Sequence, residues 1–214
     1  MADIFNILVV GVGGQGVVLL GNLLRQFGLN SPFIKNVVGT ETRGVSQREG
    51  SVIATTRYLI DSKIYNLDQG YEIDDLISPS IPINDAHIVL GLEPLETIRN
   101  LKYISEQTVV VLNTSRRYPR DVVIKKGSNK LYPPTARILE ILDQFARKTV
   151  SMDFSRLSIS EFGNSIYANT IILGVATKEF ENVFIKENFL QILKDNLKPI
   201  GANIEAFELG YNLI

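Results

Sequence analysis

The sequence contains no cysteine and a single histidine, His87, among its 214 residues. Without cysteine the chain cannot form disulfides, use a thiolate nucleophile, or supply thiolate ligands to zinc or iron–sulfur clusters. With one histidine, a multi-histidine metal site is not possible, and a Ser-His-Asp triad would have to use His87. These counts remove most hydrolytic and metal-based chemistries from this chain. They also fit a reducing compartment, and we expect a cytoplasmic protein.

The chain also lacks an excess of charge of either sign, with 22 Lys and Arg against 23 Asp and Glu. Nucleic-acid binding requires basic side chains that neutralise phosphates, so we expect no nucleic-acid partner. Residues 4–24 carry no charged side chain and are long enough for a membrane span. However, this run holds five glycines, and a buried strand followed by a helix explains it better. We therefore expect no membrane segment.

Apolar strands alternate with amphipathic helices along the chain. Strands are expected at Ile4–Val10, Phe33–Val38, Ser51–Tyr58, Ala86–Leu92, Thr108–Leu112 and Thr149–Phe154, with a short edge strand at Asp121–Lys125. Helices are expected up to Phe27, from Pro94, and at Pro134–Lys148, Asn164–Phe180, Lys186–Leu197 and Ala202–Tyr211. The polar stretch GTETRGVSQREG at 39–50 is longer than a routine connection, which is typical of functional loops.

This alternation predicts an α/β fold, a three-layer Rossmann-like domain with a largely parallel or mixed sheet and helices on both faces. We expect a single domain over residues 1–214.

The stretch GVGGQG at 11–16 lies between the first expected strand and the first helix. Gly11, Gly13 and Gly16 fit G-x-G-x-x-G, whose glycines permit a tight turn, close approach of a ligand and helix–strand packing. The helix N-terminus then presents free N–H groups to an anion. A dinucleotide site also needs a carboxylate about 20 residues further on, and the nearest, Glu41, lies inside the polar loop. The same glycines can also serve helix packing alone.

The doubled glycine also resembles the turn of enzymes that adenylate ubiquitin-like proteins. Those enzymes typically add a reactive cysteine or a cysteine-bound zinc, and this chain has neither.

Six blocks of the sequence carry a wider resemblance. They are GVGGQGVVLLGNLL, ETRGVSQREGSV, LGLEPLETIRNL, VVVLNTSRRYP, NSIYANTIILGVA and NIEAFELGY. In this order, over essentially the whole chain, they resemble the gamma-type subunits of 2-oxoacid:ferredoxin oxidoreductases, and most closely the small (beta) subunit of the indolepyruvate enzymes. One departure is Arg48-Glu49-Gly50, where the family usually has Arg-Gly-Gly.

The resemblance implies a part in the CoA-dependent oxidative decarboxylation of 2-oxoacids, with arylpyruvates such as indolepyruvate favoured. It implies a larger partner subunit that holds thiamine diphosphate and the iron–sulfur clusters, and ferredoxin as the electron acceptor of the complex. This chain alone would hold no cofactor, except that CoA can bind at the glycine turn. Two alternatives remain open: a free-standing Rossmann-type nucleotide-binding enzyme, and a scaffold subunit whose turn binds nothing.

The candidate ligand-binding residues fall into two groups. The first is the glycine turn itself, namely Gly11, Gly13, Gly14, Gln15 and Gly16. The second is Arg43, Gln47 and Arg48, whose side chains can clamp a phosphate or carboxylate, although loop residues of this kind are also commonly solvated. We expect no catalytic acid, base, nucleophile or metal ligand in this chain.

Other polar residues near strand ends are expected to have structural roles. They are Glu93 and Glu96 around Pro94, the Asn113-Thr114 turn, His87, and Asn164 as a helix N-cap. Ligand contact is the alternative at Glu93 and Glu96, because such a turn can face the crevice of an α/β sheet, and at Asn113 and Thr114, because they end a strand. Glu96 and Arg99 are expected to form a surface pair.

Overall fold

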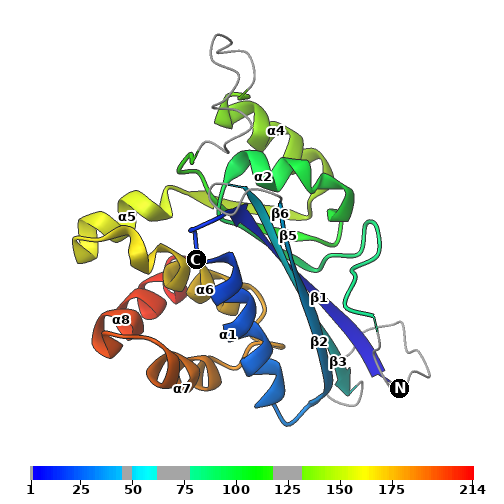
Figure 1. Cartoon of the computed structure of the whole chain (residues 1–214), viewed down its shortest axis with the longest axis vertical. Helices are drawn as coiled ribbons and strands as arrows, with labels where there is room; N and C mark the ends of the chain where they lie inside the picture. Colours follow the sequence, from blue (N-terminus) through cyan, green and yellow to red (C-terminus); the bar gives the residue numbers. More distant parts are fainter. Residues whose placement is uncertain (1, 45–49, 62–77, 118–131) are drawn as a thin grey trace.

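A mixed sheet forms the centre of the molecule, with strand order β2-β3-β1-β4-β5-β6 (Figure 1). The computed structural model describes residues 2–44, 50–61, 78–117 and 132–214. Within them the strands are β1 (Ala2–Val12), β2 (Ile34–Arg43), β3 (Ser51–Asp61), β4 (Ile88–Gly91), β5 (Val109–Asn113) and β6 (Lys148–Met152). Strands β1, β4, β5 and β6 run parallel, whereas β3 is antiparallel to both β1 and β2. The predicted α/β class with a mixed sheet is confirmed.

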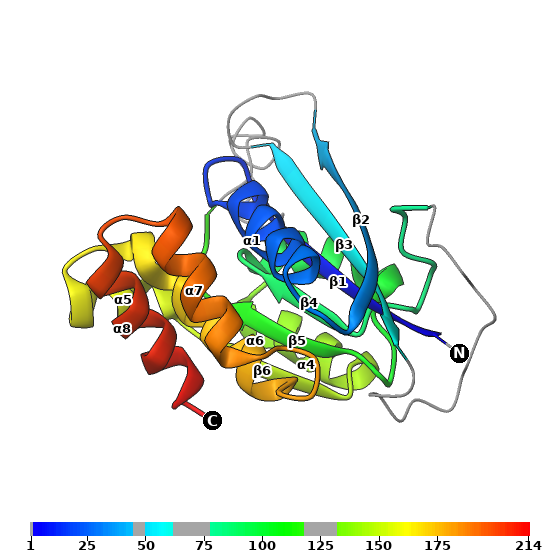
Figure 2. The ribbon, with the colours of Figure 1, turned by 90° about the horizontal axis from the view of Figure 1, so that it is seen from below.

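Helices cover both faces of this sheet (Figures 1 and 2). They are α1 (Val17–Leu29), α2 (Pro94–Arg99), α4 (Thr135–Phe145), α5 (Phe154–Phe162), α6 (Ala168–Glu179), α7 (Lys186–Asn196) and α8 (Ile200–Tyr211), with 3-10 turns η1 (Leu101–Tyr103) and η2 (Ser165–Tyr167). No helix among the described residues is long and apolar enough to cross a membrane.

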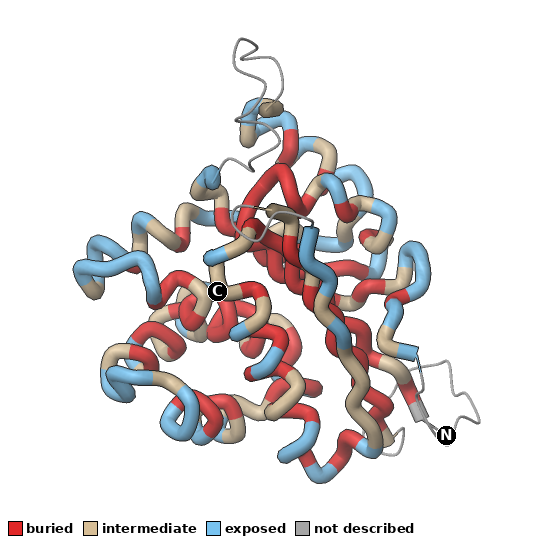
Figure 3. The backbone as a smooth tube through the Cα atoms, in the orientation of Figure 1, coloured by how far each residue is buried: buried red, intermediate tan, exposed pale blue. Residues whose placement is uncertain are grey.

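The alternating side chains of β1 divide the core into two layers. Phe5, Ile7 and Val9 pack with α1, α6, α7 and α8 on one face. Leu8 and Val10 pack on the other face with α4 and part of α2. Figure 3 shows the central strands as the most buried part of the chain, while much of α5 is exposed. Strands buried on both faces read as continuous apolar runs, which is why β1, β4 and β5 were predictable.

Strand β2 extends further than the sequence predicts. Residues 39–43 were expected in the polar loop, but Thr40 pairs with Thr55 and Arg43 with Val52 across the β2–β3 hairpin. The polar side chains of residues 39–43 suggested a loop, but their backbone hydrogen bonds to β3 make them part of a partly exposed strand. Residues 45–49 of the expected loop, and the expected edge strand Asp121–Lys125, lie outside the described residues.

Helix α5 was not predicted. It begins after Asp153, whose carboxylate accepts a hydrogen bond from Arg156 N at 2.9 Å, and ends at Gly163, which is left-handed at φ 71°. An N-cap aspartate and a C-terminal glycine are the local signals that could have revealed it. The helix places Ser155 and Ile159 beside the site described next.

Candidate functional site

The glycine turn joins the end of β1 to the start of α1. Gly14 (φ 90°) and Gly16 (φ 85°) are left-handed, which glycine adopts without the steric penalty of a Cβ atom. Gly13 N donates a hydrogen bond of 2.8 Å to Gly50 O, which ties the turn to the start of β3. Gly11, in contrast, is buried within β1, and a Cβ there would stand 3.0 Å from Gln15 Oε1. Gly11 therefore has a packing role in the described structure.

The side chain of Gln15 links two strand ends. Its Oε1 accepts a hydrogen bond from Val12 N at 2.7 Å, and its Nε2 donates one to Leu92 O at 3.0 Å. The backbone carbonyl of Gln15 accepts a further bond from Asn169 Nδ2 at 2.7 Å. Asn169 lies on α6, so three elements hold the turn in one conformation.

A cleft of about 490 Å³ opens on one side of the turn. Because β1, β4, β5 and β6 are parallel, the segments that follow them meet at one edge of the sheet, and each contributes to the cleft or its rim. Helices α1 and α2 leave this edge toward opposite faces, which is where open α/β sheets bind ligands. We call this space the glycine cleft. Besides Gln15, its polar lining residues are Asn113, Ser115, Arg116, Arg117, Ser155, Ser165 and Asn169.

Two arginines give the glycine cleft a positive wall. Arg117 reaches the turn, since a Cβ on Gly14 would stand 3.3 Å from its Nη2. Arg116 is held by α4, because its Nε donates to Thr135 Oγ1 at 2.9 Å and its guanidinium lies over the Tyr132 ring. None of the described residues that line the cleft is acidic. Sequence reasoning missed both arginines as site residues, because only the fold brings 116–117 beside 14.

The segment after β5 is also fixed locally, as expected for an Asn-Thr turn. Asn113 Oδ1 accepts a hydrogen bond from Ser115 N at 3.2 Å, and Asn113 Nδ2 donates one to Ser155 Oγ at 2.9 Å. These bonds confirm a local structural role for Asn113. They also connect β5 to α5 at two residues that line the cleft.

A second cavity, of about 270 Å³, lies on the other side of the turn. Its lining includes Gly13, Gly14, Gly16 and Arg43, so the structure brings part of both predicted groups together. Glu41 forms ion pairs with Arg25 and, at 3.7 Å, with Arg43. Glu41 is the carboxylate that the sequence offered for the ribose of a dinucleotide, and in the structure it is paired with these two arginines. Gln47 and Arg48 lie outside the described residues, as does Glu49.

Glu93 acts as the N-cap of α2. Its Oε2 accepts a hydrogen bond from Glu96 N at 2.9 Å, and its Oε1 accepts one from the Tyr132 hydroxyl. Burial raises the pKa of the Glu93 carboxyl, while the bonds from Tyr132 and Glu96 N oppose that shift. The predicted structural role at the helix N-terminus is confirmed. The predicted pair of Glu96 and Arg99 is present at 2.7 Å, but it is not a surface pair, because the Glu96 side chain is buried.

Two other polar residues also have the structural roles expected of them. His87 Nδ1 accepts a hydrogen bond of 3.0 Å from Asn6 N, and burial lowers the pKa of the imidazole. Asn164 accepts one of 3.1 Å from Ile166 N and caps η2, which precedes α6. The described residues contain no group of three or more acidic or histidine side chains able to hold a metal ion.

A glycine turn at the carboxyl ends of parallel strands in an α/β sheet is typical of the Rossmann-like class of folds. A model of the family described as pyruvate ferredoxin/flavodoxin oxidoreductase matches residues 6–213, so the chain belongs to that family. It is 30% identical over 209 residues to the indolepyruvate oxidoreductase subunit IorB of Pyrococcus horikoshii, covering 96% of this chain and 94% of that relative.

Solved structures share the fold. The pyruvate oxidoreductase subunit PORC of Thermotoga maritima matches with a TM-score of 0.66 at 15% identity, covering 98% of this chain and 96% of that one. A 2-oxoglutarate:ferredoxin oxidoreductase from Magnetococcus marinus, with 2-oxoglutarate, coenzyme A and succinyl-CoA bound, matches with a TM-score of 0.63 at 13% identity. That match covers 98% of this chain and 30% of the longer chain.

Proposed function

We propose that this chain is the non-redox subunit of a thiamine diphosphate-dependent 2-oxoacid:ferredoxin oxidoreductase that acts on arylpyruvates such as indolepyruvate. The observation that carries the proposal is the family match over residues 6–213 in a chain without cysteine. Such a chain cannot ligate iron–sulfur clusters through thiolates, so the clusters belong to a larger partner together with thiamine diphosphate. The oxidoreductase activity is then a property of the hetero-oligomer, with ferredoxin as its acceptor.

Coenzyme A is the ligand that we assign to the glycine cleft. The N-terminus of α1 offers backbone N–H groups, and Arg116 and Arg117 offer charged donors, which together suit phosphate groups. The hydroxyl and amide side chains that also line the cleft suit the polar parts of the coenzyme. In this proposal Gly13, Gly14 and Gly16 approach the ligand, whereas Gly11 and the Gln15 side chain shape the turn.

Arg43, Gln47 and Arg48 remain the second group of candidates. Arg43 lines the smaller cavity, on the far side of the turn from Arg117. We assign this group to a phosphate or carboxylate that approaches the turn from the β2–β3 side, from the coenzyme or from the partner subunit.

The experiment that tests the proposed function is anaerobic affinity capture of the tagged chain from its own cells, with mass spectrometry and assays for iron and thiamine. We expect a larger cysteine-rich chain to be captured together with both cofactors. The eluted complex should oxidise indolepyruvate only when CoA is present. Recovery of the chain alone, or turnover of a 2-oxoacid by the isolated chain, would contradict the proposal.

A further inference from the structure

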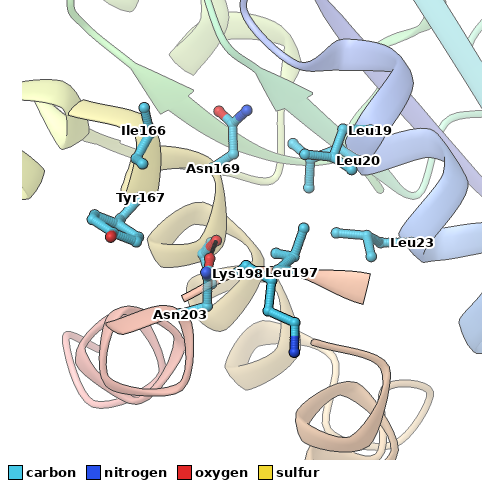
Figure 4. A pocket seen from close by; sticks show the side chains of 10 residues that line it. Leu19, Leu20, Leu23, Ile166, Tyr167, Asn169, Leu197, Lys198 and Asn203 are labelled. Carbon is cyan, nitrogen blue, oxygen red and sulfur yellow. Dashed lines mark hydrogen bonds between the residues drawn. The ribbon is translucent and has the colours of Figure 1, made fainter. Parts of the chain in front are cut away.

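A small apolar pocket lies beside the glycine cleft and is not explained by coenzyme binding. It has a volume of about 150 Å³ and lies between α1, η2 and the segment that joins α7 to α8. Figure 4 shows Leu19, Leu20 and Leu23 of α1 facing Ile166 and Tyr167 across it. Leu197 closes the third side. We call this space the leucine pocket.

Besides Tyr167 and Lys198, three polar side chains line the leucine pocket, and these three already have partners. Thr170 Oγ1 donates a hydrogen bond to Asn203 Oδ1 at 3.1 Å, and Asn203 Nδ2 donates one to Pro199 O at 2.8 Å. Asn169 Nδ2 is committed to Gln15 O. Apart from Lys198, the remaining lining of the pocket is aliphatic or aromatic, which favours an apolar group. A leucine-lined cavity of about 150 Å³ is large enough to bind a benzene-sized ring.

The leucine pocket adjoins the glycine cleft, because Leu19, Ile166 and Asn169 line both. At this boundary the side chains are unusually open for their type: Leu19 is 44% exposed and Ile166 is 61% exposed. Deeper in the pocket, Leu20 is 1% and Leu23 is 4% exposed. One molecule can therefore place a phosphate-bearing part in the cleft and an apolar end among the leucines.

We infer that the leucine pocket binds the aromatic ring of an arylacetyl thioester whose CoA portion lies in the glycine cleft. This inference rests on the proposed function, since oxidative decarboxylation of an arylpyruvate with CoA yields an arylacetyl thioester. It assigns this subunit a part in recognising the acyl group. The chain then prefers aryl over acetyl thioesters even when the thiamine-bearing partner is absent.

Calorimetric titration of the full chain with CoA, acetyl-CoA, phenylacetyl-CoA and indole-3-acetyl-CoA tests the inference. Burial of one aromatic ring should make the two arylacetyl thioesters bind about tenfold more tightly than acetyl-CoA. Leu23→Phe narrows the pocket and should lower that ratio. Leu29→Phe makes the same change on the same helix at a side chain that is 74% exposed, and should keep the ratio of the wild type.

A second variant covers the case in which Leu23→Phe does not fold. Ile166→Ala alters only an exposed side chain at the boundary, and should lower the ratio about threefold by removing part of the contact with the ring. Methyl spectra of the leucines should shift on addition of indole alone, first at positions 19, 20 and 23.

The outcomes separate the two proposals. If CoA binds but the arylacetyl thioesters bind no more tightly than acetyl-CoA, the inference is overturned and the coenzyme site stands. If no CoA compound binds, the coenzyme site fails, and the thioester inference fails with it. If Leu23→Phe keeps the preference yet no longer captures the larger partner, the pocket receives a side chain of that partner, which also overturns the inference.

Discussion

At the scale of single residues, the conformation of the glycine turn depends on contacts between parts of the chain that are far apart in sequence. Asn169 reaches Gln15 O across 154 positions, and Gly16 leaves the space for it. The pattern G-x-G-x-x-G predicted the turn and its place between strand and helix. It could not predict Asn169 or Arg117, because no local periodicity relates them to the turn.

Substitution of Gly16 by alanine tests this arrangement. Its φ of +85° is strained for an L-residue, at a cost of about 1–2 kcal/mol, and the new Cβ would stand 2.5 Å from Asn169 Nδ2. Gly163→Ala is the matched control, since Gly163 is also left-handed at +71° but has nothing within 4 Å. We expect urea denaturation to show a larger loss of stability for Gly16→Ala. Equal losses would mean that the Asn169 contact is unimportant.

Glu93 should make the stability of the chain depend on pH. Burial raises the pKa of its carboxyl above the ordinary value of 4.5, so the folded state binds this proton more readily than the unfolded state. Stability contributed by this group is therefore present at low pH and is lost as pH rises through the raised pKa. Glu93→Gln should gain stability relative to wild type as the pH rises above 4.5, measured by denaturation at each pH.

Tyr132→Phe tests the same pH dependence through the hydrogen-bond partner of Glu93. The Tyr132 hydroxyl donates to Glu93 and lowers the pKa of that carboxyl, so its removal should move the loss of stability to higher pH. Parallel pH profiles for wild type, Glu93→Gln and Tyr132→Phe would show that Glu93 does not titrate in this range.

At the scale of elements, helices α6 and α8 touch through their backbones. A Cβ on Gly174 would stand 2.1 Å from Phe207 O, and one on Gly210 would stand 2.0 Å from Ile171 O. This close crossing fixes α6, which carries Asn169 to the glycine turn and Thr170 to the leucine pocket. The packing of two helices far from the sheet edge thus determines the geometry of the candidate site.

Gly174→Ala should therefore destabilise the protein although alanine favours helices. The clash with rigid backbone should cost about 1–3 kcal/mol or more, which exceeds the helix-propensity gain of about 1 kcal/mol. Gly201→Ala in the first turn of α8 is the matched control, because nothing lies within 4 Å of the new Cβ. Its midpoint in urea should stay the same or rise. A Gly174→Ala midpoint equal to that of the control would show that the helices can separate at little cost.

The elements that could be predicted are those whose burial is uniform. Apolar runs marked β1, β4 and β5 directly, whereas β2 was cut short because its last residues are polar and partly exposed. Helix α5 was missed because its short, serine-containing sequence buries only Phe154 and Ser158. The positive wall of the glycine cleft could not be predicted either. Arg116 and Arg117 follow β5 in the chain, but they face a turn that lies about 100 residues earlier in the sequence.

At the scale of the whole molecule, the absence of cysteine predicts how the complex should behave when it is taken apart. Under the proposed function, the partner freed of this chain keeps its iron and thiamine but loses productive use of CoA. Adding the chain back should restore turnover. Reconstitution with Arg117→Ala should restore assembly and cofactor content while raising the KM for CoA about tenfold, as expected for the loss of a charged hydrogen bond worth about 1.5–3 kcal/mol.

Lys194→Ala controls for the change in net charge in that reconstitution, because it removes an exposed cation on α7 that does not line the cleft. Its KM for CoA should equal that of the wild type. If Arg117→Ala and Lys194→Ala reconstitute with the same KM, the coenzyme does not contact the wall formed by Arg117. If the freed partner instead loses iron when this chain is removed, the chain protects a cluster, and its role is structural at the interface. A raised KM with unchanged iron would place the contribution of this subunit at the coenzyme, apart from electron transfer.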